Sequence, residues 1–210
     1  MKVLKYESRK QEKELYSTKK KPVLLTIPKQ RFISLPGVGD PNKDGFKQRI
    51  QTLYPVAYGI KMAYKKFAAD KNLEFDDYVV FPLEGVWSLT KKGQQLDHLD
   101  KDEFSYDIMI RVPDFVPDDL IQSTIESVSV KKDLPLLSEL EIKEYPQMEV
   151  GQILHIGKYD DEPASFEKLN QLVEASGKKR ASKIHREIYL SDARRVAPEK
   201  LKTILRYRIE

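Results

Sequence analysis

The sequence predicts an α+β protein made of two copies of a β-α-β-β unit that pair about a pseudo-twofold axis. The main observation is a repeated order of strand-like and helical segments. The first set comprises residues 23–35, 44–68, 78–89 and 104–112. The second set comprises residues 148–159, 162–176, 183–190 and 202–209. One such unit cannot cover its own sheet, so we expect a mostly antiparallel sheet with helices packed on it and a central ligand cleft where the copies meet.

The composition supports this fold class and limits the function. With 210 residues, of which 40% are hydrophobic, the chain fits one duplicated domain better than two unrelated ones. No apolar run approaches the roughly 18 residues of a spanning helix, and the start lacks the apolar middle of a secretory signal. The absence of cysteine excludes disulfides and thiolate chemistry. We therefore expect a soluble, cytoplasmic protein without a membrane partner.

Positive charge concentrates at the N-terminus. Residues 1–21 hold eight basic and three acidic side chains, which leaves 29 basic and 30 acidic side chains in the rest of the chain. We predict that residues 1–20 form a charged, solvated arm and that the folded body carries no basic patch. A nucleic-acid partner is therefore not expected, and the arm is too short for a helix-turn-helix module.

The first repeat, residues 21–115, contains a long helix after a loop rich in Gly, Pro, Asn and Asp. Asp44 is the predicted cap, and Pro55 should kink or split the helix. Apolar residues at spacings of three and four draw one stripe along it, namely Phe46, Ile50, Leu53, Ala57, Ile60, Tyr64 and Phe67. The loop glycines lack the spacing of a phosphate-binding motif, which favours a plain turn.

An inserted helix, residues 116–135, separates the two repeats. It should open at Pro117 to Asp119, run through Val128 and be stopped by Pro135. The second repeat spans residues 140–210, and residues 140–145 start its first strand. Its helix is predicted from Asp161, Glu162 and Pro163 at the start and Gly177 past the end.

A carboxylate interrupts the strand-like run at 183–190. Strand alternation places His185, Glu187 and Tyr189 on one face. If that face lines the cleft, Glu187 is partly desolvated and needs a cationic or hydrogen-bonding partner. Alternatively, Glu187 faces solvent or pairs with Arg206 or Arg208 of the final strand.

A second carboxylate lies in the run at 78–89, where Glu84 and Trp87 fall on opposite parities. Pro82 and Gly85 suggest an edge position or a bulge, and a bulge at Gly85 would swing Glu84 and Trp87 toward the same space. Trp87 is the only tryptophan, and its flat ring suits an aromatic ligand as well as a core.

These segments resemble the GyrI-like small-molecule-binding proteins, in their stand-alone branch. The resemblance rests on PLEGVW (82–87) and the stretch 185–209 that begins HREIYLSD, with support from 53–66 and 104–116, and it spans roughly residues 20–210. It implies a pocket between the repeats for bulky, aromatic and often cationic organic molecules. In related effector-binding domains a buried glutamate on a late strand meets the ligand's positive charge, and Glu187 occupies the matching motif position.

The resemblance also implies a possible reaction, because some stand-alone members are similar to enzymes that hydrolyse cyclopropane-bearing, DNA-alkylating toxins. By motif position Glu187 would be the base or water-orienting group and Trp87 the stacking wall. Tyr58 or Tyr106 would be the donor, although a tyrosine at position 58 also fits an ordinary helix face. Glu84 would share the work or support the bulge, and Tyr189 would line the pocket.

A second class of function is protein interaction, such as inhibition of DNA gyrase, which the family's founding name suggests. That role needs an exposed acidic or apolar surface rather than a lined cavity. For either class we predict no cofactor and no metal, because the three histidines lack metal-ligand spacing. They are His98, His155 and His185.

Overall fold

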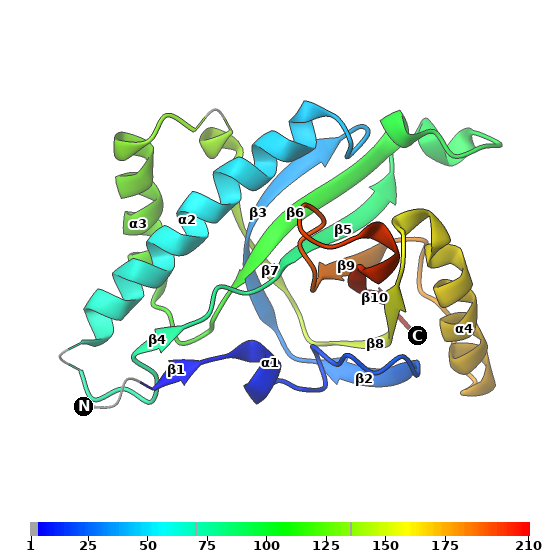
Figure 1. Cartoon of the computed structure of the whole chain (residues 1–210), viewed down its shortest axis with the longest axis horizontal. Helices are drawn as coiled ribbons and strands as arrows, with labels where there is room; N and C mark the ends of the chain where they lie inside the picture. The colour runs from blue at the N-terminus through cyan, green and yellow to red at the C-terminus, as the bar shows by residue number, and fades with distance from the viewer. Residues whose placement is uncertain (1–3, 70, 135) are drawn as a thin grey trace.

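Eight strands form one antiparallel sheet in the computed structural model, which describes residues 4–69, 71–134 and 136–210 (Figure 1). In chain order they are β2 (Val23–Ile27), β3 (Gln30–Val38), β5 (Leu83–Leu89), β6 (Phe104–Val112), β7 (Glu141–Tyr145), β8 (Met148–Ile156), β9 (His185–Tyr189) and β10 (Lys202–Arg208). Across the sheet the order is β2-β8-β10-β9-β5-β6-β3-β7. The predicted α+β class with a mostly antiparallel sheet is confirmed.

The two copies join edge to edge in the middle of this sheet. In the first copy the order outward from the centre is β5, β6 and β3, and in the second copy it is β9, β10 and β8. The central pair is β5 with β9, in which Gly85 lies opposite Glu187 and Trp87 lies opposite His185. The equal order on both sides matches the predicted pseudo-twofold arrangement.

The outer strands are exchanged between the copies. β2 leads directly into β3 yet pairs with β8, and β7 leads directly into β8 yet pairs with β3. Pro28 and Pro146 lie at the two junctions, where a residue without an N–H interrupts the ladder and favours a bend. The prediction that residues 140–145 start the first strand of the second copy is therefore wrong, because residues 141–145 form a separate strand that pairs with the first copy.

Three helices cover the sheet and one another. They are α2 (Asp44–Ala68), α3 (Asp118–Lys131) and α4 (Glu162–Ala175). α2 packs on β3 and β6, α3 packs on α2, and α4 packs on β8 (Figure 1). Within the described part of the chain, no helix has the length and apolarity needed to cross a membrane.

The helix ends agree with the sequence in part. Gly177 follows α4 with a φ of +71°, as predicted for a residue past the C-terminus. Asp44 is the first residue of α2 rather than its cap, which is Lys43. Pro55 lies inside one continuous helix, so the predicted split is wrong, and α3 runs three residues beyond Val128. The predicted stop at Pro135 lies outside the described residues.

The charged N-terminal segment packs on the body, so the prediction of a solvated arm is wrong for its described part. β1 (Lys5–Tyr6) pairs in parallel with β4 (Asp77–Tyr78), and α1 (Ser8–Gln11) follows. Leu15 and Tyr16 are buried in the main core. The Arg206 guanidinium donates to the Leu15 carbonyl at 2.8 Å. The few apolar residues of a mostly charged segment thus decide where it lies.

Candidate functional site

A cleft of about 1890 Å³ lies over the central strand pair, where the two copies meet. Its floor comes from β5 and β9, one wall from α2 and the opposite wall from the start of α4. The residues that line it include Tyr58, Trp87, Glu162, His185, Glu187 and Tyr189. The cleft predicted between the copies is therefore present, and it is open enough for a bulky molecule.

Strand pairing and one glycine create space in front of Glu187. Because alternate residues of a strand face the same side, His185, Glu187 and Tyr189 all point into the cleft. Gly85 lies directly opposite Glu187 on β5. A Cβ atom at Gly85 would stand 2.6 Å from Trp87 Nε1 and 3.1 Å from the Tyr189 hydroxyl. Only glycine leaves room for these two polar groups to meet there.

A chain of hydrogen bonds holds the Glu187 carboxylate in place. The Trp87 indole N–H donates to the Tyr189 hydroxyl at 2.9 Å, and this hydroxyl donates to Glu187 Oε2 at 2.7 Å. His185 Nε2 lies 3.0 Å from Glu187 Oε1 and donates in the corresponding tautomer. Burial, reinforced by the Glu187 charge, holds the pKa of Tyr189 well above its usual range, so Tyr189 remains a donor. Both carboxylate oxygens are thus fixed by side chains without permanent charge.

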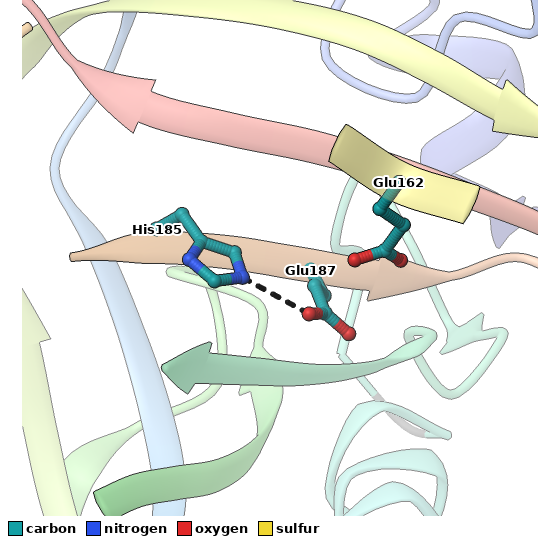
Figure 2. A group of neighbouring side chains, drawn as sticks. All are labelled: Glu162, His185 and Glu187. Carbon is teal, nitrogen blue, oxygen red and sulfur yellow. Dashed lines mark hydrogen bonds and ion pairs between the residues drawn. The ribbon is translucent and has the colours of Figure 1, made fainter. Parts of the chain in front are cut away.

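Glu162 adds a second carboxyl group to the same place. It begins α4, is 7% exposed and extends toward Glu187, with His185 on the far side (Figure 2). Burial raises its pKa well above the usual range, and the nearby Glu187 charge raises it further. Glu162 is therefore easier to protonate than an exposed glutamate. Burial and these two carboxyl groups also raise the pKa of Tyr159, at the edge of the pair, to about 12.

Glu162, His185 and Glu187 also have the atom types that metal ions bind, with one such atom from each lying within 4.8 Å of the others. The sequence did not indicate this group, because its members come from two elements. A metal ion bound here would compete with hydrogen bonds that this group already makes. Glu187 already accepts hydrogen bonds on both oxygens, and the ring nitrogen of His185 nearest to it takes part in one of them.

The structure brings most of the predicted site residues together. Glu187, Trp87, Tyr189 and Tyr58 all line the cleft, and Tyr58 is the most exposed of them at 54%. Tyr106 lies behind Trp87, with ring centroids 4.9 Å apart, and is buried outside the lining. It therefore supports the Trp87 ring and is not placed to contact a ligand.

Glu84 requires a correction. β5 pairs without interruption with β6 from Leu83 to Leu89, so the bulge expected at Gly85 does not form. Glu84 consequently faces the opposite side of the sheet, where it is 1% exposed and lies 3.6 Å from Arg186. Burial raises its pKa, and the charges of Arg186 and Arg206 partly offset that rise. Glu84 belongs to a buried ionic group beneath the cleft and not to the cleft.

The alternative placements of Glu187 are also wrong. Its side chain is 10% exposed, so it does not face solvent. Arg206 lies on the other face, where its guanidinium donates to Gln152 and to the Leu15 carbonyl. Among the described residues, the side chain close enough to form an ion pair with Glu187 is His185, and the pair is ionic only when His185 is protonated.

The residue that sequence reasoning missed is Glu162. The sequence marks it only as part of a helix start, where acidic side chains are common because they complement the helix dipole. No periodicity marks such a residue as buried. Its role depends on the closeness of the α4 start to β9, which is a tertiary contact.

Comparison with known proteins agrees with this architecture. A structure from Listeria innocua described as a hydrolase is 30% identical, with a TM-score of 0.82. A structure of an uncharacterized conserved protein from the same organism is 32% identical, with a TM-score of 0.85. Each match covers 98% of this chain and 100% of the other.

More distant matches show the fold alone. The EcmrR C-terminal domain shares it at 15% identity and a TM-score of 0.52. No curated protein sequence gives a significant match. The family model of the GyrI-like small molecule binding domain matches residues 20–209. With nearly its whole length covered by that model, and with the central cleft described above, the chain belongs to the GyrI-like small-molecule-binding family.

Proposed function

We propose that the cleft binds bulky, aromatic organic cations and protects the cell from toxic compounds of this kind. The observation that carries the proposal is the Glu187 carboxylate, which is buried at the cleft floor and fixed by the neutral hydroxyl of Tyr189 and the His185 ring. A carboxylate removed from water without a permanently charged partner attracts a cation more strongly than an exposed one does.

The walls of the cleft suit a flat and large ligand. Trp87 stacks against Phe46 with centroids 5.9 Å apart, and Phe166 lies edge-on to His185 at 5.0 Å. Such rings add stacking and cation–π attraction to the charge of Glu187. The cleft volume of about 1890 Å³ exceeds the range of roughly 300–1,000 Å³ that is usual for small ligand sites.

We further propose that the protein hydrolyses cyclopropane-bearing, DNA-alkylating compounds. Support comes from the hydrolase description of the 30% identical Listeria innocua structure and from the position of Glu187. In this reaction a water oxygen bonds to a ring carbon while one ring C–C bond breaks, and its electron pair moves onto the conjugated carbonyl oxygen. Glu187 takes the water proton and Tyr58 donates one to that oxygen, so the product contains one added water.

The test is incubation of wild type and Glu187→Gln with a cyclopropanoid compound, followed by mass spectrometry for the product with one added water. We expect the amide, which cannot take a proton, to lower the rate by about 10²- to 10⁴-fold. The matched control is Glu126→Gln, an exposed change on α3 that should leave the rate unchanged.

Two outcomes would contradict these proposals. Tight binding by wild type without product would remove the hydrolytic role and leave sequestration. Equal binding of an aromatic cation by wild type and Glu187→Gln, measured by titration calorimetry, would remove the assignment of Glu187 as the cation partner.

A further inference from the structure

We propose that Glu162 and Glu187 share one proton in the empty cleft and give it up when an organic cation binds. The inference rests on the proposed function, because it requires a cationic ligand in this cleft. It adds Glu162 as a second determinant of ligand charge and predicts that binding is an exchange of a proton for a cation.

The geometry places two carboxyl groups side by side without a permanent counter-charge. Glu162 and Glu187 are 7% and 8% exposed, and an oxygen of each lies within 4.8 Å of the other. Glu162 Oε1 is fully buried, and no donor among the described residues reaches it. Protonated Glu162 can itself donate a hydrogen bond to Glu187, which resolves both the like-charge contact and the missing partner.

Basic side chains line the wider cleft, but none of them forms an ion pair with Glu162 or Glu187; they are Arg9, Lys47, Lys101, Lys158, Lys183 and Arg194. β9 presents His185 and Tyr189, and the turn before α4 presents Tyr159 and Asp160. The loop after β9 presents Asp192, which is held by Arg194 at 2.9 Å. From α2 come the neutral rings of Tyr54 and Tyr58, and β10 places Leu205 opposite Glu187. Among these groups only His185 can become cationic in direct contact with the pair.

A bound monocation changes the protonation of Glu162 and Glu187. Without ligand, one carboxyl is ionised and the other keeps its proton, because two buried like charges at this distance repel. A positive charge in the cleft favours ionisation of both carboxyls, so the proton leaves as the cation enters. Affinity for a fixed cation should therefore rise with pH, by at most tenfold per pH unit, until Glu162 ionises in the empty protein.

The test is titration calorimetry with tetraphenylphosphonium, whose fixed charge comes without an exchangeable proton. The titrations are done at neutral pH in phosphate and in Tris, both with EDTA to exclude metal ions. The difference between the binding enthalpies measured in the two buffers gives the number of protons that are released on binding. For wild type we expect the number of protons released per bound cation to approach one. For Glu162→Gln, which keeps the size and the hydrogen-bonding capacity, we expect a value near zero with binding retained. Glu162→Asp, which keeps a titratable group, should retain release.

The outcomes separate this inference from the proposed function. If tetraphenylphosphonium does not bind wild type, the proposed cation site fails. If it binds wild type without releasing a proton, or if Glu162→Gln releases as much as wild type, the shared proton is refuted while the cation site stands. Release that persists in Glu162→Gln and disappears in His185→Gln would assign the proton to the imidazole and also overturn the inference.

Discussion

Two buried glutamates in adjacent strands differ in what they can do, and the difference lies in their partners. Glu84 faces a side of the sheet where Arg186 and Arg206 offset its charge. Glu187 faces the cleft, and its oxygens accept hydrogen bonds from Tyr189 and His185, which carry no permanent charge. A carboxylate with arginines beside it already has cationic neighbours, whereas one held by donors without a permanent charge retains its attraction for a cation.

Gly85 leaves the space in which Trp87 and Tyr189 meet beside Glu187, so we expect its replacement to disturb the site. In Gly85→Ala the new methyl group would crowd Trp87 Nε1 and the Tyr189 hydroxyl. We expect a loss of about 1–3 kcal/mol in the free energy of unfolding. Affinity for an aromatic cation should fall at least about tenfold, because Tyr189 no longer orients Glu187.

Trp87 fluorescence provides the measurement, since this tryptophan is the only one in the chain. Its emission should shift in Gly85→Ala. The control is Gly45→Ala, where the nearest side-chain atom would stand 3.4 Å from the new Cβ and no shift is expected. An unchanged emission spectrum and unchanged affinity in Gly85→Ala would show that the glycine is not required for the site.

At the scale of elements, the N-terminal segment is a structural part of the body. Glu12 pairs with Arg111 at 2.5 Å, and the carbonyl oxygens of Glu14 and Leu15 accept hydrogen bonds from Gln152 and Arg206. These contacts cover the face of the sheet opposite the cleft. The same segment continues to the cleft, where Glu7, Ser8 and Arg9 belong to its lining.

Truncation of one leucine tests this packing. Leu15→Ala should lower the free energy of unfolding by about 2–4 kcal/mol, because it leaves a cavity in the core. Leu4→Ala changes a leucine that is 51% exposed and should cost less than about 0.5 kcal/mol. Urea denaturation of both variants gives the comparison. Equal and small effects would mean that the segment is a solvated arm after all.

At the scale of the whole molecule, the two copies have the same strand order but supply different chemistry. The second copy contributes the polar groups Glu162, His185, Glu187 and Tyr189, and the first copy contributes the ring of Trp87. The site therefore exists only where the copies meet. Duplication provides the cleft, and divergence of the copies places a carboxylate from β9 beside an aromatic ring from β5 on its floor.

The raised pKa of Glu162 predicts how stability of the ligand-free protein depends on pH. Near and below the ordinary value of 4.5, folded and unfolded states both hold the proton. Above that value the unfolded state loses it while the folded state keeps it, so stability falls as pH rises toward the folded pKa. Glu162→Gln has no such proton. Its Tm should exceed that of wild type by a margin that widens between about pH 5 and about pH 9.

Thermal denaturation at several pH values in a single buffer series measures this margin. Glu126→Gln, on the exposed face of α3, controls for the loss of one carboxylate and should follow the wild-type curve. A margin that does not change with pH would mean that Glu162 is ionised in the folded protein.

The sequence alone determined the α+β class, the duplication and the order of the main helices and strands, because hydrophobic periodicity and turn residues mark these segments. The runs 23–35 and 78–89, each predicted as one strand-like segment, instead divide into two strands each, β2 and β3 in the first and β4 and β5 in the second. Strand alternation on 185–189 also placed Glu187 with His185 and Tyr189 on one face. Other features depended on contacts between distant segments: the exchange of β2 and β7, the burial of Leu15, and the approach of Glu162 to Glu187. The pattern within an element shows which side chains share a face, whereas the neighbouring elements decide what that face meets. Tertiary packing therefore placed Glu84 among arginines and Glu187 in the cleft.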